Sequence, residues 1–441
     1  MKYRIKDFLL ISVIIAAGIL SGCGRSKEEV HLILKTPPLT VGTDENAEIR
    51  EVYDLLEKAG NEFAAQYEDA DVTVDVVKFN YVDEAQYITD CFDTDKAVDV
   101  LFEGYFNMFS YIYTGRPVPL DDVLSEEALN DLSPEDLTMS KVNGKTYMLP
   151  YYDLQNTMVY NKKLFRQCGL DQYIADEGII TNWSLKDWNI ILDTLAEKLP
   201  AMHYPMMMYA KNNQGDTHIM TLLRSHGCPL FDENNDFCLN TPEGIAALTW
   251  LRNGVDKGWY PSGSENLEIS DCTELFLNDQ LAICMTNNAS YPAYEEGSAG
   301  LVNFPGIGEQ GLSTSFITGF MVFDNGDEAK LKAAKAFLRY FYSREEYLRY
   351  ETVGIPANQS VADEAKQNDA MLDAYMANRV TQVDFTGNNP NWQGTDTSVR
   401  NVFWPHIAAL LSGDVTPEAC ARAIDRDCNA AIQSGREAGS L

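Results

Sequence analysis

The stretch that decides the fold is Lys141–Leu170, KVNGKTYMLPYYDLQNTMVYNKKLFRQCGL. Asn143 and Gly144 form a turn dipeptide between apolar runs, which is typical of a β-hairpin. The apolar runs at 145–151 and 157–160 predict two strands. The polar segment between these strands carries aromatic rings, a carboxylate and amides. On residue chemistry alone, it fits an aromatic core edge with a polar turn as well as it fits a binding loop.

Length and charge narrow the class of protein. With 441 residues the chain exceeds one typical domain, so we expect two lobes. A hydrophobic content of 45%, with 11% aromatic residues, is enough to fill two cores. The formal net charge of -32 disfavours nucleic acid and anionic membrane surfaces as partners, and it favours neutral or cationic ligands over polyanions. Solubility alone is a sufficient reason for the acidity.

The N-terminus has the pattern of a targeting segment. Basic residues precede an apolar run at 8–20 that is short for a membrane span. Leu20-Ser21-Gly22-Cys23 follows and resembles a bacterial lipobox. That resemblance implies a lipoprotein signal peptide over residues 1–22, acylation of Cys23 (palmitate-type chains) and a polar tether over 23–29. The protein would then be anchored at the extracytoplasmic face of the cell membrane. The alternative is an ordinary signal peptide with a chance cysteine.

The remaining cysteines and acidic residues do not predict a metal site. No cysteine lies in a CxxC pair, which disfavours structural zinc and redox chemistry. Cys228 and Cys238 flank a turn-rich stretch and are the best candidates for a disulfide. The acidic stretch 232–243 superficially matches a calcium loop, but Phe237 stands where the loop requires glycine. The GxGxxG at 306–311 is not followed by a helix, so no cofactor is predicted.

Alternating strands and helices predict a parallel α/β sheet. We expect strands at 30–34, 72–76 and 98–102, separated by helical patterns. In open α/β sheets, ligands bind beyond the carboxyl ends of the strands. Glu103 and Tyr105 come directly after the third strand and are therefore candidate ligand-binding residues. A surface turn is an equally good reading of this segment.

Several ordered blocks resemble the extracellular solute-binding proteins, family 1, of ABC importers, the family that includes maltodextrin-binding protein. The opening stretch resembles the family's "NGK-Y-LPY…YNK-LF…GL" block. Thr181–Ser184 resembles the start of its "P-TWDEF" helix, and Thr286–Tyr291 its "NGPW" site loop. Gly354–Val361 resembles "G-LPAR-SV", with Asn358 where arginine is usual. The blocks cover nearly all of the expected mature chain.

This resemblance implies an α/β fold of the two-lobed, periplasmic-binding-protein-like type II class, with a hinge and an interlobe cleft. Lobe 1 would comprise residues 30–152, with about 303–342 returning to it. Lobe 2 would comprise 153–302, with the C-terminal helices of about 343–441 packed on it. The chain would cross between the lobes at the polar segment of the opening stretch.

The resemblance also implies site residues. Tyr151 and Asp153 would lie at the floor of the cleft. Asn288 matches the asparagine of the site loop and Tyr291 its aromatic residue, although Ala289 and Ser290 replace the usual Gly-Pro. The aromatic residue before the penultimate helix often contacts ligand in the family, which favours Trp392. We expect Tyr291 and Trp392 to stack on the ligand from one lobe, with Glu103 and Tyr105 closing from the other.

The implied function is the substrate-binding lipoprotein of an ABC importer, a monomer that passes a solute to a membrane permease. An aromatic-rich site with amides and carboxylates suits a carbohydrate. No HExxH, GxSxG or P-loop motif points to an enzyme. A secreted carbohydrate hydrolase using a pair such as Glu103 and Asp153 is one alternative. A non-transport surface lipoprotein is another.

Overall fold

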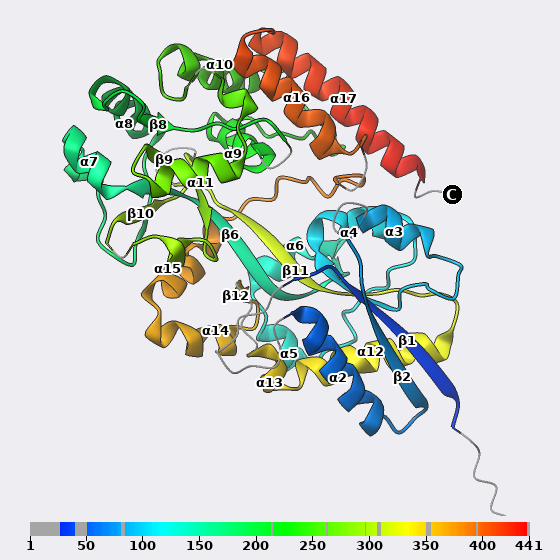
Figure 1. Ribbon diagram of the computed structural model, residues 1–441. Helices are drawn as coiled ribbons and strands as arrows, with labels where there is room; N and C mark the ends of the chain where they lie inside the picture. The colour runs from blue at the N-terminus through cyan, green and yellow to red at the C-terminus, as the bar shows by residue number, and fades with distance from the viewer. Residues whose placement is uncertain are drawn as a thin grey trace, which may run out of the picture.

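The computed structural model describes most of the chain after the expected tether. The expected signal peptide and Cys23, the expected acylation site, lie outside the described residues. Two α/β lobes are joined by long strands that run from one lobe into the other (Figure 1). The described ranges are 27–39, 51–80, 84–212, 215–261, 263–295, 297–306, 310–349, 354–393 and 396–438.

Lobe 1 contains the expected parallel sheet. Strands β1, β2 and β3 pair in parallel, with Leu34 opposite Val100, and the order continues β2-β1-β3-β11-β6. Helix α2 packs on the sheet because its apolar residues recur at helical spacing, from Val52 to Phe63. The lobe 1 elements are β1 (Glu29–Thr36), β2 (Asp71–Lys78), β3 (Val100–Gly104), α2 (Val52–Gln66), α3 (Glu84–Asp90), α4 (Met108–Tyr113), α5 (Glu126–Asn130), α6 (Pro134–Met139) and α12 (Glu328–Tyr342).

Two long strands form the hinge, and one of them corrects an expectation. β6 (Leu149–Asn161) is a single continuous strand, whereas the sequence predicted two strands with a polar segment between them. β11 (Thr314–Val322) pairs antiparallel with its first half, and β9 and β10 pair with its second half. The polar segment stays in the sheet because its backbone groups are paired and its side chains find partners elsewhere in the chain.

Lobe 2 surrounds the second half of β6. Helix α8 begins with the expected capping box, in which the Ser184 hydroxyl and the Asp187 carboxylate bond each other's backbone N–H. The lobe 2 elements are β7 (Ile180–Thr181), β8 (Tyr204–Met206), β9 (Leu281–Asn287), β10 (Ala299–Val302), α7 (Lys162–Cys168), α8 (Leu185–Lys198), α9 (Asp216–Ser225), α10 (Pro242–Asp256), α11 (Ile269–Leu277), α16 (Val399–Ser412) and α17 (Pro417–Ala438).

The remaining short elements lie around the hinge. The Asn143-Gly144 hairpin is confirmed as β4 (Lys141–Val142) and β5 (Lys145–Thr146). β12 (Ile355–Pro356) pairs with β6. Tyr347 and Val361 are buried in the lobe 1 core, so the stretch just after α12 packs with lobe 1. The other hinge-side helices are α13 (Glu345–Leu348), α14 (Gln359–Ala365) and α15 (Ala370–Asn378).

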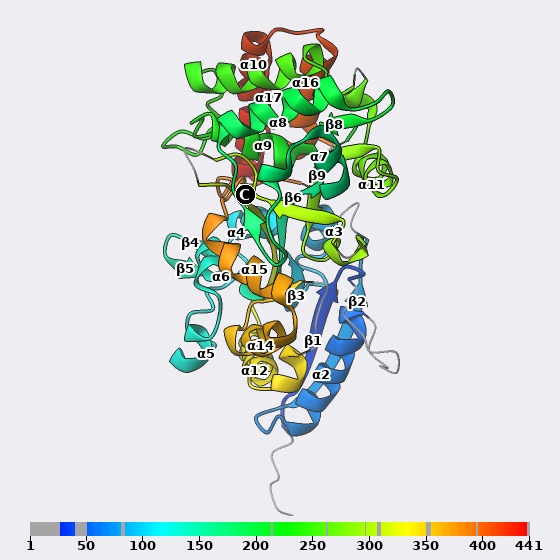
Figure 2. The same cartoon turned by 90° about the vertical axis from the view of Figure 1, so that its left-hand side faces the viewer.

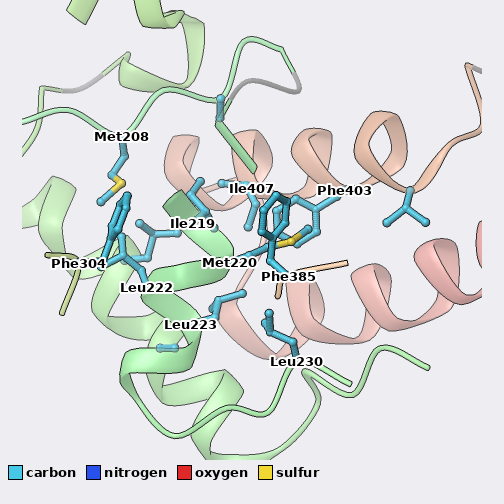
Figure 3. Packing of buried hydrophobic residues seen from close by; sticks show 14 of the residues in the cluster. Met208, Ile219, Met220, Leu222, Leu223, Leu230, Phe304, Phe385, Phe403 and Ile407 are labelled. Atoms are coloured by element: carbon cyan, nitrogen blue, oxygen red, sulfur yellow. The ribbon is translucent and has the colours of Figure 1, made fainter. Parts of the chain in front are cut away.

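One hydrophobic cluster crosses between the lobes. It joins residues of α3 and α4 in lobe 1 to the packed interior of lobe 2. Figure 3 shows the lobe 2 part of this cluster around α9, with Phe385 among its labelled side chains. Within the described residues, no helix has the length and apolar character that a membrane crossing requires.

Candidate functional site

A row of aromatic rings forms where the two lobes meet. The 3-10 turn η2 (Tyr105–Asn107) follows β3 directly, so the end of the lobe 1 sheet positions its rings. The ring of Phe106 lies 4.9 Å from Tyr105, 4.6 Å from Phe316 of the hinge and 5.5 Å from Phe385, centroid to centroid. Phe385 in turn lies 6.0 Å from Trp392. We call this region the interlobe junction.

An arginine that the sequence analysis missed completes the junction. The Arg400 guanidinium lies 5.2 Å from the centre of the Phe106 ring, a cation–π contact between the lobes. Asp216 orients this guanidinium by accepting from Nε at 2.7 Å and from Nη2 at 3.1 Å. Arg400 lies in the first turn of α16, where the helix dipole disfavours a cation. That unfavourable position is the one sequence signal that could have marked it.

Glu103 and Tyr105, the two lobe 1 candidates, are both buried beside the junction. The Glu103 carboxylate accepts from Asn107 Nδ2 at 2.5 Å and from the Tyr111 hydroxyl at 2.8 Å. The Tyr105 hydroxyl has no hydrogen-bond partner among the described residues. Burial raises its pKa well above the usual range, and the charge of Asp384 adds to this effect. Tyr105 is therefore an uncharged donor at neutral pH.

The two β6 candidates lie in the hinge itself. The Tyr151 hydroxyl donates to the Tyr347 carbonyl at 2.6 Å. Asp153 Oδ2 accepts from Arg379 Nε at 3.3 Å and from Gln382 Nε2 at 3.0 Å. Because strand side chains alternate, Asp153 lies on the face of the hinge sheet opposite to Leu154 and its partner Phe316. The structure therefore assigns Asp153 to a buried ion pair on the side away from the aromatic row.

The lobe 2 candidates are not brought together. Asn288 Oδ1 accepts from the Gln155 backbone N–H at 2.8 Å and so extends the pairing at the end of β9. Tyr291 is half-buried beside Tyr294, in the cluster under α11. Trp392 is 0% exposed and belongs to the cluster that crosses the lobes. A direct ligand contact for each of these residues stays a prediction, and the structure favours a packing role for Trp392.

The acidic turn at 232–243 has a structural explanation. Asp232 Oδ1 accepts from the backbone N–H groups of Asn234 and Asp236, and Phe231 bridges to Phe237 as a short hairpin. Among the described residues, no group of three or more metal-ligating side chains is close enough to hold an ion. Cys228 and Cys238 are both free thiols.

A surface groove of about 1650 Å³ lies away from the junction, on lobe 1. It runs between α5, α12 and α14, and none of the predicted site residues lines it. The groove is open to solvent and carries the carboxylates of Glu126, Glu127, Asp131 and Glu345. We therefore place the candidate site at the interlobe junction.

Two α/β lobes, hinge strands shared between them, and aromatic and charged side chains where they meet define a two-lobed solute-binding protein of type II. The expected fold class is confirmed. The chain matches the family model described as bacterial extracellular solute-binding protein over residues 46–347, and it belongs to that family.

Solved structures with this fold include several sugar-binding proteins. The sugar-binding protein MalE of Xanthomonas citri superposes with a TM-score of 0.71 at 16% identity, over 92% of this chain and 98% of that one. The cyclic alpha-maltosyl-1,6-maltose binding protein of Arthrobacter globiformis gives 0.69 at 18% identity, over 92% and 100%. At these identities the similarity shows the fold alone.

Curated relatives match a shorter part of the chain. A binding protein of Brucella abortus (strain 2308) is 24% identical over 182 residues, which is 41% of this chain and 41% of the relative. The chain thus spans about two-fifths of the length of the curated relatives that it matches.

Proposed function

We propose that this protein is the substrate-binding lipoprotein of an ABC importer, which captures an extracellular sugar between its lobes and delivers it to a membrane permease. The lobes would close on the ligand by bending at β6 and β11, and closure would present both lobes to the permease. Lobe 1 is taken as residues 30–152 with the returning segment, and lobe 2 as the elements that surround the far half of β6.

The contact between Arg400 and Phe106 carries this proposal. It joins the two lobes at a point where aromatic rings and buried polar groups also converge, which is the composition of a small-molecule site. Solved relatives of this fold support a carbohydrate. One was solved with maltose, one with maltotetraose and one with ribitol.

The closure proposal predicts a smaller radius of gyration with ligand. Maltose, maltotetraose and ribitol should be titrated by calorimetry, followed by solution scattering at saturation. Binding of one of them with a measurable contraction is the expected result, because the hinge strands are the bending point. Binding without contraction would contradict hinge closure, but it would leave the proposal of sugar binding intact. Cleavage of a labelled oligosaccharide would point to the hydrolase alternative.

Anchoring predicts that Cys23→Ala moves the full-length protein out of the membrane fraction or leaves its precursor uncut. The reason is that two or more acyl chains give stable attachment, whereas the charged tether alone does not. Fractionation of cells expressing the two forms checks this. Unchanged membrane retention with normal processing would contradict the lipobox interpretation. Cys91→Ala, a buried thiol within lobe 1, is the matched control.

A further inference from the structure

The carboxylates at the interlobe junction already have partners from this chain. Glu103 accepts from Asn107 and Tyr111, and Asp216 is bound by Arg400. Asp384 accepts from the backbone and hydroxyl of Thr386 and from the Gly387 N–H. A neutral sugar donates its hydroxyl protons to such oxygens, and its hydroxyl oxygens also accept hydrogen bonds. The junction thus offers few carboxylate lone pairs to a neutral sugar.

Three of the buried polar groups near the junction that make no hydrogen bond can donate one. Lys35 Nζ, the Tyr105 hydroxyl and Trp392 Nε1 make no hydrogen bond within the described residues, and their side chains are at most 1% exposed. An ammonium and an indole N–H can donate but cannot accept. Buried polar groups are nearly always hydrogen-bonded, so each such exception needs an explanation. Of these three exceptions near the junction, Lys35 is the one that carries a charge.

Lys35 supplies the charge of this set. It is the penultimate residue of β1, its Cα is paired with Leu101 of β3, and Glu103 lies two residues further along the same face. The ring of Tyr87 in α3 covers the ammonium at 4.5 Å. Figures 1 and 2 both place α3 on the side of lobe 1 that faces lobe 2. Lys35 therefore lies at the strand edge that opens toward the junction.

A buried ammonium without a counter-ion is costly, and the contact with Tyr87 offsets only part of that cost. A chain with 66 acidic residues has many possible partners, yet no described carboxylate lies within ion-pair distance of Lys35. A ligand that supplies an anion at this place would relieve the cost, and another of its oxygens would accept from the Tyr105 hydroxyl.

We propose that the ligand is an acidic sugar, a uronate whose carboxylate is received by Lys35 and one of whose remaining oxygens accepts from the Tyr105 hydroxyl. This inference rests on the proposed function and names the ligand class of the same site. The overall charge of -32 favours neutral or cationic ligands over polyanions, but a uronate carries only one carboxylate on each sugar unit. At physiological salt, exposed charges are screened beyond about 8 Å, so the local donors determine the binding of a single carboxylate.

The test compares one sugar with and without its charge. Digalacturonate, its dimethyl ester and the neutral digalactoside are titrated by calorimetry into the mature chain. We expect the acid to bind about tenfold more tightly than the ester, because a charge-assisted hydrogen bond is worth about 1.5–3 kcal/mol. Lys35→Met should abolish that preference, whereas Lys145→Met, at an exposed lysine, should leave it unchanged.

The outcomes separate this inference from the proposed function. Equal binding of acid and ester, or a preference that survives Lys35→Met, would overturn the uronate while sugar binding stands. If none of the three probes and no sugar in the closure titration binds, the proposed function fails and the inference fails with it. Lys35→Met should fold, since methionine keeps the apolar stem and removes a buried charge. If it does not, Tyr105→Phe decides, and an unchanged affinity for the acid overturns the proposal.

Discussion

Replacing Trp392 by alanine is expected to lower the free energy of unfolding by about 3–5 kcal/mol. The ring is 0% exposed and stacks on Phe237, with centroids 6.2 Å apart and planes 8° apart. The ring of Phe385 packs against it at 6.0 Å. The substitution would leave a cavity that these rings cannot fill without moving the segment that carries Phe385. Chemical denaturation of the two proteins measures the difference.

Trp404→Ala is the matched control, since Trp404 is the other tryptophan of this region and is only partly buried. It should cost clearly less stability than Trp392→Ala. If Trp392 instead lined an open ligand surface, its removal would cost about 2 kcal/mol of binding and little stability. Weakened sugar binding at an unchanged melting temperature would therefore contradict the packing that the structure gives this ring.

The fold could be predicted from the sequence because the patterns that indicate its strands and helices each span only a few neighbouring residues. The three strands of lobe 1 alternate or run apolar over a few residues, and Ser184 with Asp187 marks a helix start within four positions. The continuity of the hinge strand β6 could not be predicted in the same way. Asp153 and Gln155 suggested a loop, yet their partners Arg379 and Asn378 lie 226 and 223 positions away. The local sequence around a polar residue in a strand contains no information about a hydrogen-bonding partner so far away in the chain.

The candidate site could be predicted only in part, because many of its contacts also join residues that lie far apart in the sequence. Position at the end of a parallel strand pointed to Tyr105, and the structure places the ring of Tyr105 beside Phe106 in the same turn. The Arg400–Asp216 pair was missed because its members lie 184 positions apart in the first turns of two different helices. The family resemblance placed Asp153 at the floor of the cleft, but in β6 its side chain lies on the face of the sheet opposite to the aromatic row.

Arg379→Met is expected to cost about 3–5 kcal/mol of stability at pH 8. The guanidinium is the shared cation of Asp136 and Asp153, whose carboxylates lie 3.5 and 3.3 Å from it and are both 0% exposed. Without the guanidinium, one of the two carboxylates must either stay ionised without a counter-ion or take up a proton, and both alternatives cost stability. The loss should therefore be smaller at pH 5, where protons are available. Urea denaturation at both pH values measures it.

Asp136→Asn is expected to act in the opposite direction. Burial, followed by the negative charge of Asp153, raises the pKa of Asp136 well above its usual value. Because the folded state binds this proton more tightly than the unfolded chain, the stability that it contributes is complete at low pH and is lost as the pH rises through the folded pKa. The amide removes that dependence, so the variant should be more stable than the wild type at pH 8 and should lose less stability between pH 5 and pH 8. A variant that is destabilised most strongly at pH 8 would instead show that Asp136 is ionised there and contributes as a paired carboxylate.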